Sequence, residues 1–142
     1  MNYLPGFLTF IDDLRAHGVL TAVVTSSNQP KMASVYRQRP GFRQLFDAIL
    51  TSEDFAESKP APDCYLRAAA RFDVPPTDCI VFEDSFNGLR SGRAAGMFVV
   101  GVATTNPREA IALLSDVQIT DYVNLSYDQL NHLLKSRIVN NS

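Results

Sequence analysis

The sequence predicts an α/β fold, in which a parallel sheet is covered by helices on both faces. Segments typical of strands and of helices alternate along the 142-residue chain. Two of the strand segments, "VLTAVVT" (19–25) and "MFVVGVA" (97–103), are apolar almost throughout instead of alternating between apolar and polar residues. Strands of this kind are buried on both sides, as in a parallel sheet between two helical layers. The length suits one domain, expected over residues 1–136, with a tail over 137–142.

The first half of the chain opens with a predicted helix over residues 6–17. Phe7, Ile11 and Leu14 recur there at helical spacing, and Gly18 follows as a stop signal. The segment over 19–25 is rich in β-branched residues, which favour a strand, and the segment over 28–39 has Pro30 in its first turn, as helices often do. They predict a strand over 19–25, a helix over 28–39 and a strand over 46–52.

The second half continues the alternation. In "APDCYLRAAARFD", one apolar helical face is expected to hold Tyr65, Leu66, Ala69 and Phe72. Asn106 followed by Pro107 is typical of a helix cap and first helical position. The predicted elements are a helix over 61–73, a strand over 79–83, a helix over 85–96, a strand over 97–103, a helix over 106–115, a short strand over 119–123 and a helix over 126–136.

The composition excludes several classes of function. The formal net charge is −2 and no basic block is present, which argues against a nucleic-acid partner. No apolar run reaches the roughly 20 residues that a membrane-spanning helix needs. Cys64 and Cys79 form neither a disulfide framework nor a Cys-x-x-Cys motif, and we expect both to be reduced thiols in a cytoplasmic protein.

Polar residues follow the predicted strand over 19–25, at the end of the strand where parallel sheets bind ligands. Thr25, Ser26, Ser27 and Asn28 offer hydroxyls and backbone N–H groups at the start of a helix, a combination that suits a phosphate. Alternatively, Ser27 or Asn28 only caps the helix.

Lys59 follows the next strand and precedes Pro60. A proline restricts the residue before it to extended conformations, so the direction of this lysine is partly fixed. A positioned ammonium acts as a point charge beside a phosphate. The alternative is a solvated loop lysine.

Glu83 and Asp84 are adjacent carboxylates at the end of the strand over 79–83. Two such groups repel each other and are costly to bury unpaired. A divalent cation removes the conflict, and Mg²⁺ suits both carboxylate ligands and phosphate substrates. Alternatively, Asp84 or Ser85 only caps the following helix.

Three stretches carry a resemblance to a known family. "VVTSSN" (23–28), "SKPAPDCYLRAAA" (58–70) and "VFEDSFNGLRSGRAAGM" (81–97) resemble, in order, three of the four motifs of the haloacid dehalogenase-like hydrolases. The similarity extends over residues 3–135 and is greatest to the β-phosphoglucomutase-like phosphatase branch. It implies a three-layer, Rossmann-like parallel sheet and a phosphatase or phosphomutase that acts on small phosphorylated metabolites with Mg²⁺.

The resemblance also implies roles for individual residues. Thr25 matches the hydroxyl that binds the transferring phosphoryl group, and Lys59 matches the lysine that offsets its charge. Asp84 matches a magnesium ligand, and Glu83 matches its acidic neighbour. In that family the phosphoryl group moves to an aspartate, from which water or a sugar hydroxyl then removes it.

The first motif of that family, an Asp-x-Asp-Gly-Thr loop that carries the nucleophile, has no match here. Asp12 and Asp13 lie within a predicted amphipathic helix and are expected on its solvated face. The family's cap is absent too, so the chain resembles the back portion of a longer protein. The N-terminal central strand is expected to be missing between the strands that end at Thr25 and Glu83.

Two exposed strand edges would follow from that loss. They are expected to close against each other or to be covered from outside, by a second copy of the chain in a homodimer or by the missing N-terminal segment. Without the aspartate, little or no turnover is expected from the isolated chain. The alternatives are a non-catalytic phosphate-binding or protein-interaction module, and one half of a split enzyme.

Overall fold

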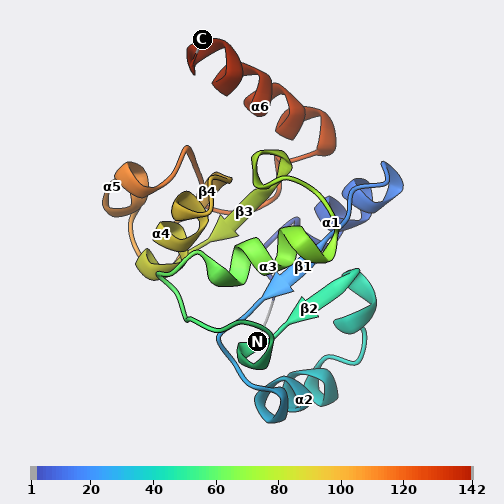
Figure 1. The fold of residues 1–142 in the computed structure, drawn as a ribbon. Helices are drawn as coiled ribbons and strands as arrows, with labels where there is room; N and C mark the ends of the chain where they lie inside the picture. Colours follow the sequence, from blue (N-terminus) through green and yellow to red (C-terminus); the bar gives the residue numbers. More distant parts are fainter. Residues whose placement is uncertain (1–2, 142) are drawn as a thin grey trace. The chain divides into compact units, whose positions relative to one another are not determined.

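The computed structural model describes residues 3–141, with side chains over 3–135 (Figure 1). The described chain divides into two compact units, residues 3–20 together with 121–141, and Thr21–Thr120. None of the described helices combines the length and the apolar character needed to cross a membrane.

The smaller unit contains α1 (Phe7–Ala16) and α6 (Tyr127–Asn141). Asp13 accepts a 2.8 Å hydrogen bond from the N–H of Tyr127, at the start of α6. Asp13, expected on the solvated face of its helix, is only partly exposed, because its carboxylate satisfies a helix N–H that would otherwise lack a partner. Helix α6 continues over residues 137–141, which were expected to be a tail; residue 142 lies outside the described residues.

The larger unit confirms the predicted α/β class, since every strand pair in it is parallel. Its strands form two sheets, one in the order β1-β2 and the other in the order β3-β4-β5. Strand β4 is buried along its whole length, as its apolar sequence predicted. The strands are β1 (Ala22–Val24), β2 (Ala48–Leu50), β3 (Ile80–Glu83), β4 (Phe98–Val102) and β5 (Val117–Ile119).

The break between the two sheets falls between β1 and β3, the position expected for the missing strand. Among the described residues, β1 pairs only with β2, and β3 pairs only with β4. The two edges therefore do not close against each other. Strand β5 begins and ends earlier than the predicted 119–123. Its residues pair with Val100–Val102 of β4, with Gln118 opposite Gly101.

The helices of this unit connect the strands, and short 3₁₀ turns lie in the connections, one of them directly after α5. Asn28 and Ser85 cap α2 and α4, each accepting a backbone N–H through its side chain. Asn106 does not cap the helix that follows it, which begins after Pro107 and is shorter than predicted. The α-helices are α2 (Gln29–Gln38), α3 (Asp63–Arg71), α4 (Phe86–Ala94) and α5 (Arg108–Ile111), and the 3₁₀ turns are Arg43–Leu45, Ser52–Asp54, Pro76–Asp78 and Ala112–Leu114.

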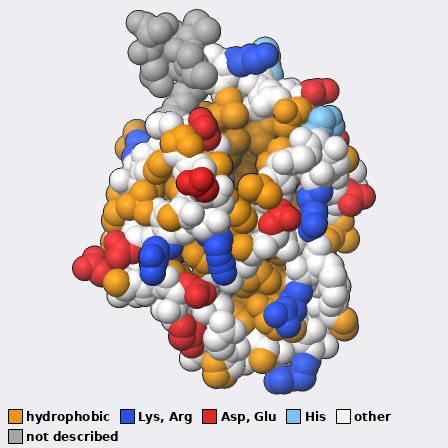
Figure 2. Space-filling model, turned by 45° about the vertical axis from the view of Figure 1, so that its right-hand side comes forward, with side chains coloured by type: hydrophobic (Ala, Val, Ile, Leu, Met, Phe, Trp, Pro, Cys, Tyr) orange, Lys and Arg blue, Asp and Glu red, His pale blue; other side chains and the backbone are white. Residues whose placement is uncertain are grey.

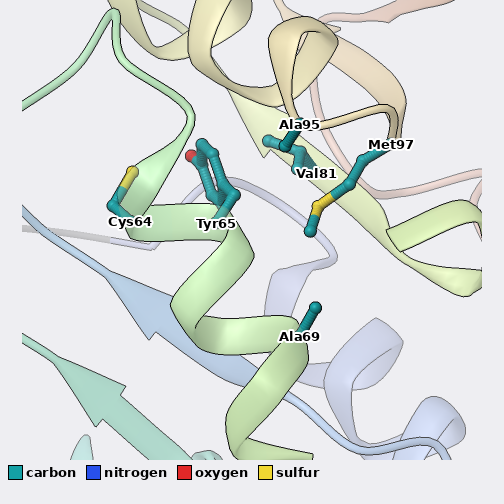
Figure 3. Packing of buried hydrophobic residues seen from close by; sticks show 6 residues of the cluster. All are labelled: Cys64, Tyr65, Ala69, Val81, Ala95 and Met97. Atoms are coloured by element: carbon teal, nitrogen blue, oxygen red, sulfur yellow. The ribbon is translucent and has the colours of Figure 1, made fainter. Parts of the chain in front are cut away.

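A buried cluster centred on α3 joins the two sheets on one face. Val81 of β3 belongs to the cluster, and Val24 of β1 packs against it. Helix α3 thus contributes to the core of both sheets (Figure 3). The buried members are Cys64, Tyr65, Ala69, Val81, Ala95 and Met97.

Candidate functional site

One lysine joins the carboxyl ends of β1 and β3. The Nζ of Lys59 donates a 3.2 Å hydrogen bond to the carbonyl oxygen of Val24 and lies 2.7 Å from Oε1 of Glu83. Val24 directly precedes Thr25, and Glu83 directly precedes Asp84. The structure therefore brings together the three strand-end segments that the sequence singled out.

The Lys59–Glu83 ion pair is largely shielded from solvent, since each side chain is 11% exposed. The ammonium also lies 5.1 Å from the centre of the Tyr65 ring, a cation–π distance. An ammonium has three N–H donors, and the bonds to Val24 and Glu83 occupy two of them. Lys59 is thus held in place and keeps the capacity to donate to one further acceptor.

The carboxylate of Glu83 is engaged at both oxygens. Oε1 accepts from Lys59 and, at 3.2 Å, from the hydroxyl of Tyr65. Oε2 accepts from the N–H of Ser85 at 3.4 Å and from its hydroxyl at 3.3 Å. Gly88 makes the room, because a Cβ there would lie 2.0 Å from Cδ of Glu83. Glu83 therefore fixes the position of Lys59.

Tyr65 contacts the candidate site, although sequence reasoning assigned it only to an apolar helix face. Its ring is buried in the cluster on α3, while its hydroxyl reaches Glu83. Burial, and then the nearby Glu83 carboxylate, raise the pKa of this phenol above its ordinary value. Tyr65 consequently remains protonated and remains a donor to Glu83.

Asp84 is the exposed member of the acidic pair. Thr105 and Asn106 approach it from the carboxyl end of β4: the Thr105 hydroxyl lies 3.5 Å from the Asp84 carboxylate, and the Asn106 amide donates to the Asp84 carbonyl at 3.3 Å. Sequence reasoning missed both residues, although "TTN" (104–106) follows a strand as the other candidates do.

The donor set for a metal is small. Among the described residues, no group of three or more His, Cys, Asp or Glu side chains is placed to hold a metal ion. Magnesium is, however, commonly held by one or two carboxylates together with waters and substrate phosphate. The exposed carboxylate of Asp84 fits that pattern, whereas the carboxylate of Glu83 is already hydrogen-bonded at both oxygens.

The turn after β1 is ordered by its own side chains. Thr25 accepts the N–H of Ser27 through its hydroxyl oxygen at 3.1 Å, so its O–H is free to donate elsewhere. Asn28 accepts the N–H of Lys31 at 3.0 Å, the capping role that was the alternative for this residue. Ser26 is exposed at the surface of the turn.

Glu53 changes what the start of α2 offers to a ligand. Its carboxylate accepts the N–H of Gln29 at 3.1 and 3.2 Å, and bonds to the hydroxyl of Thr51 and to this N–H lower its pKa. Glu53 is therefore an anion that already occupies one N–H of the helix start. The helix end therefore offers one N–H group fewer to an anion than the sequence suggested, and the hydroxyls of the turn become the more important candidate donors.

Comparison with known proteins adds independent findings. Residues 3–96 match the model of a family described as haloacid dehalogenase-like hydrolase. The chain is 39% identical to protein CbbY of Rhodobacter capsulatus over 104 residues, which cover 70% of this chain and 45% of that protein. It is 36% identical to β-phosphoglucomutase of Bacillus subtilis over 107 residues, covering 75% and 46% respectively.

A solved structure agrees in fold. CbbY from Rhodobacter sphaeroides in complex with phosphate superimposes with a TM-score of 0.76 at 31% identity, covering 86% of this chain and 55% of that one. The chain spans about half the length of each of these relatives.

Proposed function

Because this chain belongs to the haloacid dehalogenase-like hydrolases, in their phosphatase branch, we propose that it is the core of a phosphatase or phosphomutase that acts on small phosphorylated metabolites with Mg²⁺. The observation that carries the proposal is the ammonium of Lys59, fixed between the ends of β1 and β3. The names of similar proteins point to the same substrate class; one is a fructose-1-phosphate phosphatase of Escherichia coli, 36% identical over 96 residues.

Each residue of the site has a part in binding a phosphoryl group. The third N–H of Lys59 and the O–H of Thr25 donate to its oxygens, with Ser26, Ser27 and Asn28 forming the surrounding turn. Asp84 would hold a magnesium ion, which would offset the negative charge of the phosphoryl oxygens. Glu83 orients Lys59 and lies next to the metal ligand without itself coordinating.

Catalysis in this family needs an attacking aspartate, and the carboxylate bonded to Lys59 is not suited to that role. Both oxygens of Glu83 accept hydrogen bonds from Lys59, Tyr65 and Ser85. A carboxylate held in this way is a poor nucleophile, because attack would break several of these bonds. The isolated chain is therefore expected to bind phosphate and to hydrolyse phosphate esters slowly or not at all.

Phosphate release tests this directly. We expect no release from p-nitrophenyl phosphate or from sugar phosphates with millimolar Mg²⁺, while inorganic phosphate shifts the backbone NMR signals of residues 25–28. Thr25→Val should weaken that binding about tenfold, the value of roughly one lost charge-assisted hydrogen bond. Turnover that survives purification and disappears in Asp84→Asn would contradict the proposal, since it would reveal a nucleophile within this chain.

A second candidate is a non-catalytic phosphate-binding module, favoured because no described aspartate matching the family's nucleophile accompanies the donors at Lys59 and Thr25. The two candidates differ in one outcome. A catalytic core should begin to release phosphate from its substrates when the missing aspartate is supplied, and a binding module should not.

Free thiols at Cys64 and Cys79 support a cytoplasmic location. On the face drawn in Figure 2, Lys and Arg side chains alternate with Asp and Glu, which supports a partner other than nucleic acid.

A further inference from the structure

Lys59 lies in a turn over residues 58–61, which is called the lysine turn below. The N–H of Ala61 donates a 3.0 Å hydrogen bond to the carbonyl of Ser58, so Lys59 and Pro60 are the two central residues of this turn. The bonds of the ammonium fix the far end of the Lys59 side chain. They do not fix the backbone from which that side chain starts, so the turn needs support of its own.

A serine within α4 supplies this support. Ser91 is buried, and its hydroxyl donates a 2.6 Å hydrogen bond to the carbonyl of Ala61, which lies 30 positions away in the sequence. A serine inside a helix usually turns its hydroxyl to solvent or to the carbonyl four residues earlier in the same helix. The hydroxyl of Ser91 instead leaves its helix and binds the residue that closes the lysine turn.

A buried thiol completes this contact. The Sγ of Cys64, on α3, lies 3.4 Å from the Oγ of Ser91. Ser91 has a single hydroxyl proton, and a carbonyl cannot donate, so that proton belongs to the bond with Ala61. The thiol of Cys64 is therefore the donor to Ser91. Both side chains are completely buried, so water does not compete for these bonds.

The same helix also holds the carboxylate that binds Lys59. Ser85, at the start of α4, donates through its hydroxyl to Oε2 of Glu83 at 3.3 Å. Gly92 lets α4 approach β3 and β4, since a Cβ there would lie 3.2 Å from valine side chains on both strands. Helix α4 therefore contacts both sides of the ion pair, through Ser85 at the carboxylate and through Ser91 at the lysine turn.

We propose that Ser91 is a positioning residue for Lys59, because its bond to the carbonyl of Ala61 sets where the lysine turn lies relative to Glu83. Without this bond the turn would shift while the ammonium remained on Glu83, and the third N–H of Lys59 would no longer be held in one direction. The positioning itself depends on these contacts alone. Only its consequence for phosphate affinity rests on the proposed function.

Ser91→Ala tests the proposal, because it removes the hydroxyl and retains a good helix former. We expect the N–H of Ala61 to exchange with solvent at least about tenfold faster, the result of losing roughly one buried hydrogen bond. The NMR signal of the Lys59 ammonium should shift or broaden. The dissociation constant for inorganic phosphate, measured on the same samples, should rise about fivefold.

Ser115→Ala is the matched control. Ser115 is also buried, and its hydroxyl donates at 2.7 Å to the carbonyl of Ile111, four residues earlier. The control therefore removes a similar bond in the connection between β4 and β5. It should accelerate exchange near Asp116, whose N–H is bonded to β4, and leave Ala61, the Lys59 signal and the phosphate affinity unchanged.

Three outcomes of this comparison would overturn the proposal. Two of them are equal effects of both variants at Ala61 and Lys59, and no effect of Ser91→Ala at either residue. The third is faster exchange at Ala61 with an unchanged Lys59 signal, since the bond would then be structural only.

A measurement on the unchanged chain decides the question if Ser91→Ala fails to fold. The Ser91 hydroxyl proton should exchange slowly enough to give an NMR signal with a nuclear Overhauser contact to Ala61, and its absence would overturn the proposal. If the unchanged chain binds no phosphate but Ser91→Ala displaces the Lys59 signal, the proposed function is contradicted and the role of Ser91 is supported. Intact phosphate binding with an undisturbed Lys59 signal in Ser91→Ala would contradict the role of Ser91 alone.

Discussion

Replacing Lys59 with methionine is expected to lower the free energy of unfolding by about 3–5 kcal/mol, the usual result of removing one partner of a buried ion pair. The carboxylate of Glu83 would remain largely shielded from water and would lose its 2.7 Å partner. The carbonyl of Val24 would lose a donor at the same time. Urea unfolding, followed by circular dichroism, measures the change.

A double variant is the control for this prediction. Lys59→Met combined with Glu83→Gln removes both charges, and a neutral amide still accepts from Tyr65. The double variant should therefore recover much of the lost stability, because the cost lies in an isolated charge more than in the missing contact. A single variant that is as stable as the original chain would show that the pair is solvated and does not fix the site.

Gly88→Ala is expected to destabilise the chain by about 1–3 kcal/mol, although alanine is the better helix former by about 1 kcal/mol. The added Cβ would lie 2.0–2.4 Å from the carboxylate atoms of Glu83. Side chains can often move away from such a contact, but Lys59, Tyr65 and Ser85 hold this carboxylate. The new methyl group would therefore displace Glu83 and loosen Lys59.

Gly41→Ala is the matched control, because a Cβ at Gly41 meets nothing within 4 Å. This change should stay within about 0.5 kcal/mol of the original stability. Adding Gly88→Ala to Lys59→Met should cost less than the sum of the two, since both disturb the same ion pair. Additive effects, or a stabilised Gly88→Ala variant, would contradict the role given to Glu83.

The fold class could be predicted from the apolar pattern of the strands. The proximity of the strand-end residues could be predicted from one rule of parallel sheets. Apolar strands indicated a doubly covered sheet, and the carboxyl ends of parallel strands share one edge. That rule placed Lys59 near Glu83 before any coordinates. The break between β1 and β3 was expected from a family resemblance, and no periodicity in the residues themselves indicated it.

The hydrogen-bonding roles of several residues could not be predicted, since they depend on partners far away in the sequence. Helical spacing assigned Tyr65 to an apolar face, but spacing does not show that its hydroxyl reaches Glu83. The carboxylate of Glu53 takes the N–H of Gln29, and Asn106 bonds to the backbone of Asp84 instead of capping its own helix. Local pattern indicates which face a side chain occupies, whereas its polar partner depends on tertiary packing.

The divided sheet also bears on the cooperativity of unfolding. The half with β1 and β2 has three-residue strands, whereas the other half is built around the fully buried β4. With a lysine and one helix face joining them, the halves need not melt as a single unit. Limited proteolysis in moderate urea should therefore cleave residues 21–50 first and leave residues 80–120 intact. A single all-or-none transition would instead indicate that Lys59 and α3 together couple the two halves.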